Sequence, residues 1–223
     1  MALILCIETT TTNCSVALAK DGEVLQLKED MGLNYSHAER LHSYIQEVLD
    51  NASVSKEEMN AVAVSKGPGS YTGLRIGVSS AKGLSFALGI PLISTNTLKA
   101  LAMQVKDDAV YIIPLLDARR MEVYSAVYDS SFNELRGVEA QIIDENSFAD
   151  FLNTGKTVFI GDGAEKLKHI ISHPNANFIT DALPSAREMA FLVEAKNKIS
   201  DIEDVAYFEP YYLKDFVAIK SKK

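Results

Sequence analysis

The sequence is poor in positive charge, in cysteine and in long hydrophobic segments. Lys and Arg number 22 against 30 Asp and Glu, so the net charge is −8, and the one cluster of lysines is at residues 220–223. Proteins that bind nucleic acids gain much of their affinity from clustered Lys and Arg, which neutralise phosphates. We therefore expect no direct RNA binding by this chain alone. No apolar run approaches the length of a membrane-spanning helix.

The two cysteines, Cys6 and Cys14, lie in apolar segments where a free thiol behaves as a small hydrophobic group. A chain of 223 residues with 47% hydrophobic residues can form its core without a disulfide bond. The first residues carry no basic segment of the kind that begins a signal sequence. Together these features predict a cytoplasmic protein that is globular throughout.

The first half of the sequence has the pattern of a mixed sheet with helices on its faces. Apolar or alternating segments predict strands at 3–8, 14–19, 23–29, 61–65 and 92–95. Apolar residues at helical spacing predict helices at about 36–49, 72–88 and 97–105. Asp21-Gly22 is a hairpin signal between the second and third strands. Ser36 with Glu39 gives the capping pattern of the first helix, and Gly89 suits the left-handed position that ends the second.

A weaker pattern of the same kind follows in the second half. It predicts strands at 111–116, 122–128 and 158–160, and helices from 163 to about 174 and over 185–198. Ser185 with Glu188 gives the capping pattern of the last helix. A soft boundary near 105–109 divides the chain into two lobes, residues 1–106 and 107–223. No linker-like composition marks this boundary, so we expect the lobes to share an interface.

The most distinctive segment is the glycine-rich stretch 67–75, Gly-Pro-Gly-Ser-Tyr-Thr-Gly-Leu-Arg, which leads into a helix. Such a turn can bind phosphate through its backbone amides, but the Gly-Lys-Ser/Thr of a P-loop is absent. The helix that follows is rich in small residues, at positions 73, 77, 79, 80, 81, 83, 85 and 87. Small residues lower helix propensity. A close helix contact, within the chain or with a partner, is therefore favoured over phosphate binding.

The residues alone give no catalytic or metal site. His169 and His173 have the spacing of a metal pair, but no third ligand lies near them in the sequence, and His37 and His42 do not share a helix face. No Ser or Cys lies in a nucleophile-elbow pattern.

Asp117 and Arg119 lie between two predicted strands. An Arg–carboxylate pair that fixes the turn is the favoured interpretation. A buried ion pair or a functional acid are the alternatives, and the pair could also steady the junction of the two lobes.

The order of several motifs resembles the TsaB (YeaZ) family, which are partner subunits in the synthesis of threonylcarbamoyladenosine in bacterial tRNA. The resemblance rests on residues 4–10 and 14–18, 37–41, 67–77, 117–119 with 122–124, 161–163 and 210–214. It implies an α/β, actin-like fold (ASKHA, ribonuclease H-like) of two lobes with mixed sheets, in which the second lobe is shortened.

The resemblance also implies a function. In this family the related protein TsaD transfers a threonylcarbamoyl group from threonylcarbamoyl-AMP to N6 of the adenosine beside the anticodon. TsaD holds its metal with two histidines four residues apart, and at that place this chain has Asn96-Thr97-Leu98-Lys99-Ala100. Those side chains cannot replace two imidazoles. The implied role is a non-catalytic subunit, without metal or cofactor, that activates TsaD and meets tRNA only through the complex.

TsaB-like proteins bind TsaD through two helices of the first lobe, and the small ATPase TsaE joins at that junction. Without TsaD the same surface could support a homodimer. Transferred to this sequence, the interface residues are His37, Leu41, Tyr44, Gly73, Ile76, Gly77 and Ser80. The alternative is that these side chains belong to the core of the chain itself.

Glu8, Thr9 and Thr10 match the place where actin-like kinases have a metal-supporting Asp and phosphate-contacting hydroxyl groups. Glu replaces the usual Asp and no lysine accompanies it, so these residues are read as a vestigial phosphate loop. Arg120-Met121 stands where the family more often has Met-Gly, so the turn there is expected to differ. The competing hypothesis is a small actin-like phosphotransferase or ATPase that acts alone. A peptidase is disfavoured because no metal or nucleophile pattern is present.

Overall fold

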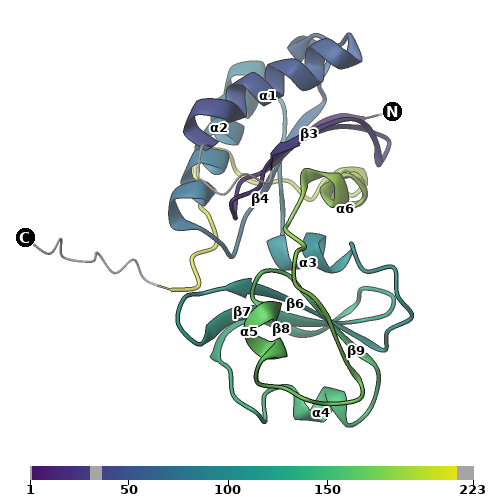
Figure 1. Ribbon diagram of the computed structural model, residues 1–223. Helices are drawn as coiled ribbons and strands as arrows, with labels where there is room; N and C mark the ends of the chain where they lie inside the picture. Colours follow the sequence, from purple (N-terminus) through teal and green to yellow (C-terminus); the bar gives the residue numbers. More distant parts are fainter. Residues whose placement is uncertain (1, 31–36, 215–223) are drawn as a thin grey trace, which may run out of the picture.

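Two five-stranded mixed sheets organise the chain in the computed structural model, which describes residues 2–30 and 37–214 (Figure 1). The first sheet has the order β3-β2-β1-β4-β5, and the second has the order β8-β7-β6-β9-β10. In both sheets the first strand along the chain pairs antiparallel with the second and parallel with the fourth. The two lobes therefore repeat one topology.

The strands of the first sheet are β1 (Leu3–Glu8), β2 (Cys14–Lys20), β3 (Glu23–Asp30), β4 (Ala61–Ser65) and β5 (Leu92–Thr95). Those of the second are β6 (Tyr111–Asp117), β7 (Glu122–Asp129), β8 (Glu134–Ile142), β9 (Thr157–Ile160) and β10 (Ala176–Ile179). The helices are α1 (His37–Ala52), α2 (Tyr71–Leu88), α3 (Thr97–Ala102), α4 (Ala149–Leu152), α5 (Ala164–Lys168) and α6 (Ala186–Lys198), with a 3-10 turn η1 at Lys56–Glu58.

Both faces of the first sheet are buried, which explains the continuous apolar runs of its inner strands. Leu5 and Ile7 of β1 face α1 and α2, while Ile4 and Cys6 face α6 on the other side. Figure 1 shows the two long helices on one face of this sheet and α6 on the opposite face. Cys6 and Cys14 are both free and buried.

The lobe that contains the first sheet is completed by residues far beyond position 106. Helix α6 packs against β1, β2 and β5. Helix α3 lies between the two sheets: its Leu98 and Leu101 pack into a cluster with Ile112 and Tyr128 of the second sheet. The two lobes therefore share buried surface on both sides of α3.

The expected order of elements in the first half is confirmed, and two end signals act as predicted. Gly89 ends α2 with a φ of 65° in the left-handed region, and the Ser185 side chain accepts a hydrogen bond from the Arg187 amide at the start of α6. The predicted cap at Ser36 lies outside the described residues.

Other predictions are wrong in extent. Helix α3 ends at Ala102, not at residue 105, and α5 ends at Lys168 instead of near Pro174. After α5 the chain turns so that Ile171 is buried. His173 precedes Pro174, and the residue before a proline disfavours the helical conformation. β8, α4 and β10 have no counterpart among the elements expected from the sequence. β8 is a charged edge strand, so its pattern is weak.

The C-terminal strap, residues 201–214, runs back along α2 in the opposite direction. It begins where the amide of Glu203 donates to Leu92 O at 2.8 Å, and it later passes the glycine-rich loop, where the Tyr211 amide donates to Lys66 O at 2.7 Å. Lys214 then forms an ion pair with Glu122 of β7. Within the described part of the chain, no helix is long and apolar enough to span a membrane.

Candidate functional site

The glycine-rich loop packs directly on the turn between β1 and β2. The Ser70 amide donates to Thr10 O at 2.7 Å, and the Thr9 hydroxyl donates to Gly73 O at 2.8 Å. A Cβ on Gly69 would lie 2.5 Å from Thr10 Cβ, and one on Gly73 would overlap Thr9 O. These glycines are therefore required by a contact inside the chain.

The small residues of α2 divide into two groups. Gly77 faces inward, because a Cβ there would overlap Thr9 Oγ1. Gly83 faces outward, and a Cβ there would meet no atom within 4 Å. A glycine inside a helix costs about 1 kcal/mol relative to alanine. No atom of the described chain therefore requires a glycine at position 83.

A shallow hollow of about 350 Å³ surrounds Gly83. It lies between α1 and α2 and is lined by His42, Ser79, Ser80, Gly83 and Leu84. Phe86, one turn further along α2, is 83% exposed. A hollow of small residues beside an exposed aromatic ring is a typical feature of a helix-packing interface.

The seven interface residues expected from the sequence do not share one environment. Four of them are buried within this chain: His37, Leu41, Gly73 and Gly77. The other three are partly exposed: Tyr44, Ile76 and Ser80.

Three of these seven side chains make contacts inside the lobe. Leu41 belongs to the core beneath α1 and α2. The His37 ring contacts Thr11 O at 2.7 Å through Nε2, and burial lowers the pKa of this imidazole. The Tyr44 hydroxyl donates to Asp30 Oδ2 at 3.2 Å, which directs this ring toward β3.

His42 and Gly83 line the hollow and Phe86 is exposed near it, but none of the three was among the interface residues expected from the sequence. His42 was weighed only as a metal ligand, although its Nε2 lies 3.4 Å from Ser80 Oγ across the two helices. Phe86 is a large apolar residue within a small-residue helix, and that contrast is the signal that could have identified it.

Glu8 lies beneath the glycine-rich loop and is fully buried. Its Oε1 accepts a hydrogen bond from the Thr10 amide at 2.6 Å, and its Oε2 has no hydrogen-bond partner among the described residues. Burial raises the pKa of this carboxyl group, and the nearby hydroxyl groups of Ser65 and Thr10, together with the backbone amide of Thr10, only partly oppose that shift. Glu8, Thr9 and Thr10 are each at most 2% exposed, so none of the three is open to solvent.

A second cavity, of about 250 Å³, lies at the start of α6. It is lined by Glu29, Gln104, Asp181, Ala182, Leu183, Ser185, Arg187 and Glu188. Three carboxylates face one guanidinium there, so the cavity disfavours a phosphate group.

The prediction that Asp117 forms an ion pair with Arg119 is wrong, because Asp117 pairs with Lys166 instead. Asp117 Oδ1 pairs with Lys166 Nζ at 2.7 Å, and it accepts a hydrogen bond from the backbone amide of Arg119 at 2.6 Å. Arg119 has a φ of 72° and Arg120 a φ of 51°, so the carboxylate fixes a tight turn through the backbone. Lys166 supplies the positive charge opposite Asp117, because it lies on α5, next to the end of β6.

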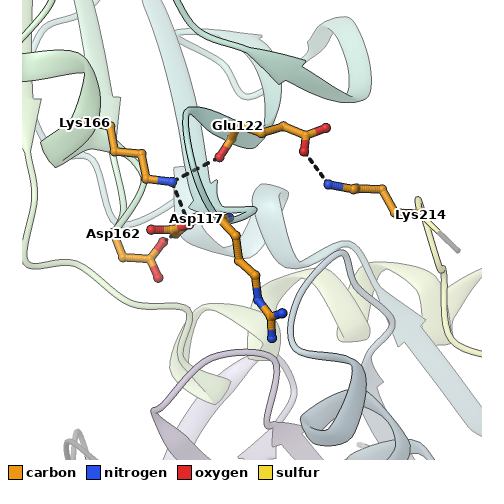
Figure 2. Close-up of polar contacts among 6 residues, drawn as sticks. Asp117, Glu122, Asp162, Lys166 and Lys214 are labelled. Carbon is orange, nitrogen blue, oxygen red and sulfur yellow. Dashed lines mark hydrogen bonds and ion pairs between the residues drawn. The ribbon is translucent and has the colours of Figure 1, made fainter. Parts of the chain in front are cut away.

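Figure 2 shows how this turn is joined to its surroundings. Lys166 also donates to Glu122 O at 3.2 Å, and the Glu122 carboxylate pairs with Lys214 of the strap. Asp162 accepts a hydrogen bond from the Asp117 amide at 2.9 Å, and burial raises the pKa of its carboxyl group. The cluster ties β6, β7, α5 and the strap together.

The histidine pair expected to share a helix does not. His169 follows the end of α5 and lies 3.1 Å from Glu165, whereas His173 is beyond the helix and accepts a hydrogen bond from the Asn175 amide. No group of three metal-binding side chains is found among the residues that the structure describes.

Comparison with known proteins gives one consistent result. The family model described as "TsaD: tRNA N6-adenosine threonylcarbamoyltransferase" matches residues 33–222. The chain is 31% identical to the tRNA threonylcarbamoyladenosine biosynthesis protein TsaB of Escherichia coli, over 97% of this chain and 96% of that protein. It is 30% identical to TsaB of Bacillus subtilis, over 95% and 93%. The structure of YeaZ from Pseudomonas aeruginosa superimposes with a TM-score of 0.79 at 26% identity, over 96% of this chain and 100% of that one. The likeness covers both lobes, and the expected actin-like fold is confirmed.

The two environments of the α2 glycines predict opposite effects of the same substitution. Gly77→Ala should lower the free energy of unfolding by about 1–3 kcal/mol, because its methyl group overlaps Thr9. Gly83→Ala should raise it by up to about 1 kcal/mol, because the methyl group meets nothing and helix propensity improves. Urea unfolding of both variants measures the difference. Equal effects would show that the two positions are not distinct.

The raised pKa of Glu8 predicts a pH-dependent benefit of Glu8→Gln. In the unfolded chain the carboxyl group titrates near 4.5, and in the folded chain it titrates higher. Its contribution to stability is therefore complete below that pH and is lost as the pH rises toward the folded value. The variant should gain stability relative to the parent as the pH is raised from about 4.5 into the neutral range. Parallel unfolding free energies over this range would contradict the assignment.

Proposed function

The chain belongs to the TsaB (YeaZ) family of tRNA threonylcarbamoyladenosine biosynthesis proteins, and from this premise we propose that it is the non-catalytic subunit that binds and activates TsaD. TsaD would then transfer the threonylcarbamoyl group to N6 of the adenosine beside the anticodon. Because its net charge is −8, this chain would meet tRNA only through the complex. The cytoplasm is the compartment that this role requires.

The observation that carries the proposal is the outward-facing Gly83 in its hollow between α1 and α2. The hollow accepts a ridge of side chains from a facing helix, and Phe86 supplies a knob next to it. Aromatic side chains in such positions often dominate the binding energy of an interface. We propose TsaD as this partner because the chain is related both to TsaB and to the TsaD family model.

The proposed contact residues are Ile76, Ser80, His42, Gly83 and Phe86. Leu41 and Gly77, two of the buried residues expected from the sequence, would support this surface indirectly. They fix how α1 and α2 lie on the sheet. TsaE is proposed to join at the edge of the same junction. When TsaD is absent, a second copy of this chain could bind to the same surface and form a homodimer.

The non-catalytic role is supported by the closed state of the phosphate position. Glu8 lies under the glycine-rich loop, and the loop contacts Thr9 and Thr10 without a gap. A nucleotide phosphate would have to displace Ser70 and Gly73 from that turn. An independent phosphotransferase or ATPase is therefore the weaker alternative.

The partner surface is tested by filling the hollow. Gly83→Leu should weaken binding of the cognate TsaD by at least about tenfold and reduce threonylcarbamoyladenosine formation in a reconstituted reaction, because the new side chain blocks the facing helix. Gly137→Leu on the exposed edge of β8 is the matched control, since a Cβ there meets only Glu134 Oε1 at 3.6 Å. Unchanged binding of Gly83→Leu would remove this surface from the proposal.

The alternative is tested by calorimetry of the purified chain with Mg-ATP. We expect no binding with a dissociation constant below about 1 mM. Binding that is tighter, and that is lost in Glu8→Gln, would favour the phosphotransferase instead.

A further inference from the structure

The C-terminal strap packs along one side of α2, and α1 packs along the other side. Lys82 of α2 donates to Phe208 O at 2.8 Å and to Ala206 O at 3.2 Å. Nearer the start of the helix, the Tyr212 ring packs on Tyr71 with centroids 5.1 Å apart. A chain that docks on the outer face of α2 must therefore lie beside the strap as well (Figure 1).

Tyr207 is an aromatic anchor on the strap that this chain itself leaves uncovered. It is 84% exposed, and the two carbonyls that bind Lys82 stand on either side of it. Its backbone is fixed, since Asp204 Oδ1 accepts hydrogen bonds from the amides of Ala206 and Tyr207. Phe86 is four residues after Lys82 and so lies on the same face of α2. Tyr207 and Phe86 thus mark one exposed aromatic edge.

Both borders of this surface carry negative charge. On the strap Asp204 and Glu209 are exposed, and on α1 Glu39 and Asp50 are exposed on the side that carries His42. Asp204 accepts hydrogen bonds from strap amides and Asp50 accepts one from Gln46 Nε2, but none of the four carboxylates has an ion-pair partner among the described residues. Their negative charge is therefore not neutralised by a neighbouring cation.

The two cations of α2 do not neutralise these borders freely. Lys82 is held by the carbonyls of the strap, and the Arg75 guanidinium lies 4.2 Å from the centroid of the Tyr71 ring. A second copy of this chain would bring the same acidic borders, and a further net charge of −8, against them.

We propose that the docking surface extends from α1 and α2 onto the strap, with Tyr207 as an anchor beside Phe86, and that it fits a chain whose apolar helix ridge is flanked by Lys and Arg. This inference rests on the proposed function, and it selects TsaD over a second copy of this chain as the occupant. The borders contribute specificity and association rate, while the aromatic edge contributes affinity.

The anchors are tested by measuring the affinity of the cognate TsaD for three serine variants. Phe86→Ser and Tyr207→Ser should each weaken binding about tenfold. Phe191→Ser is the control, because that ring is 65% exposed on α6, on the opposite face of the sheet, and it should change binding less than about twofold. All three rings are exposed, so the variants should fold.

The outcomes separate the two proposals. Loss of binding in Phe86→Ser alone would overturn the role of the strap and leave the proposed function intact. Equal loss in Phe191→Ser would show that the surface is elsewhere. No binding of TsaD by the unaltered chain would overturn the proposed function itself.

The choice of occupant is tested by charge reversal. Glu39→Lys with Glu209→Lys should weaken TsaD binding several-fold at about 50 mM NaCl, and the effect should shrink at about 500 mM. The same variant should self-associate more strongly than the parent in sedimentation velocity, because repulsion between two copies is reduced. Tight self-association of the parent at low salt, unaffected by the reversal, would overturn the choice of TsaD.

Discussion

The contact between the glycine-rich loop and the β1–β2 turn is the constraint on which the rest of the first lobe depends. The hydrogen bonds from Ser70 to Thr10 and from Thr9 to Gly73 fix the first turn of α2 above the sheet. Glu8, Thr9 and Thr10 are all buried next to this contact. One packing arrangement thus closes the turn over Thr9 and Thr10 and orients a helix whose outer face is exposed at Gly83 and Phe86.

The outer face of α2 has its own composition, which the inner contact does not explain. Gly77 serves the chain, because any side chain there would meet Thr9. Gly83 serves nothing in the described chain and lies in a hollow beside exposed Phe86. In the proposed interface, the exposed acidic residues of α1 and of the strap would set the charge that a partner must complement. Affinity and choice of partner are therefore assigned to different residues.

Much of this could be predicted from the sequence, and the exceptions have physical causes. The strands of the first sheet are continuous apolar runs, so periodicity identifies them, whereas β8 is a charged edge strand that carries little signal. A small-residue helix indicates a close contact, but only the position of Thr9 decides which glycines are used inside the chain. The return of α6 to the first sheet and the path of Tyr207 along α2 are tertiary facts, and no local pattern encodes them.

The central claim is that the outer face of α2, together with its two borders, receives a catalytic partner. The most direct measurement is amide hydrogen exchange of this chain with and without the cognate TsaD. We expect added protection in α1, in the second half of α2 and in residues 203–208 of the strap, with β8 unchanged. Protection that falls on the second sheet, or none on α2, would contradict the account.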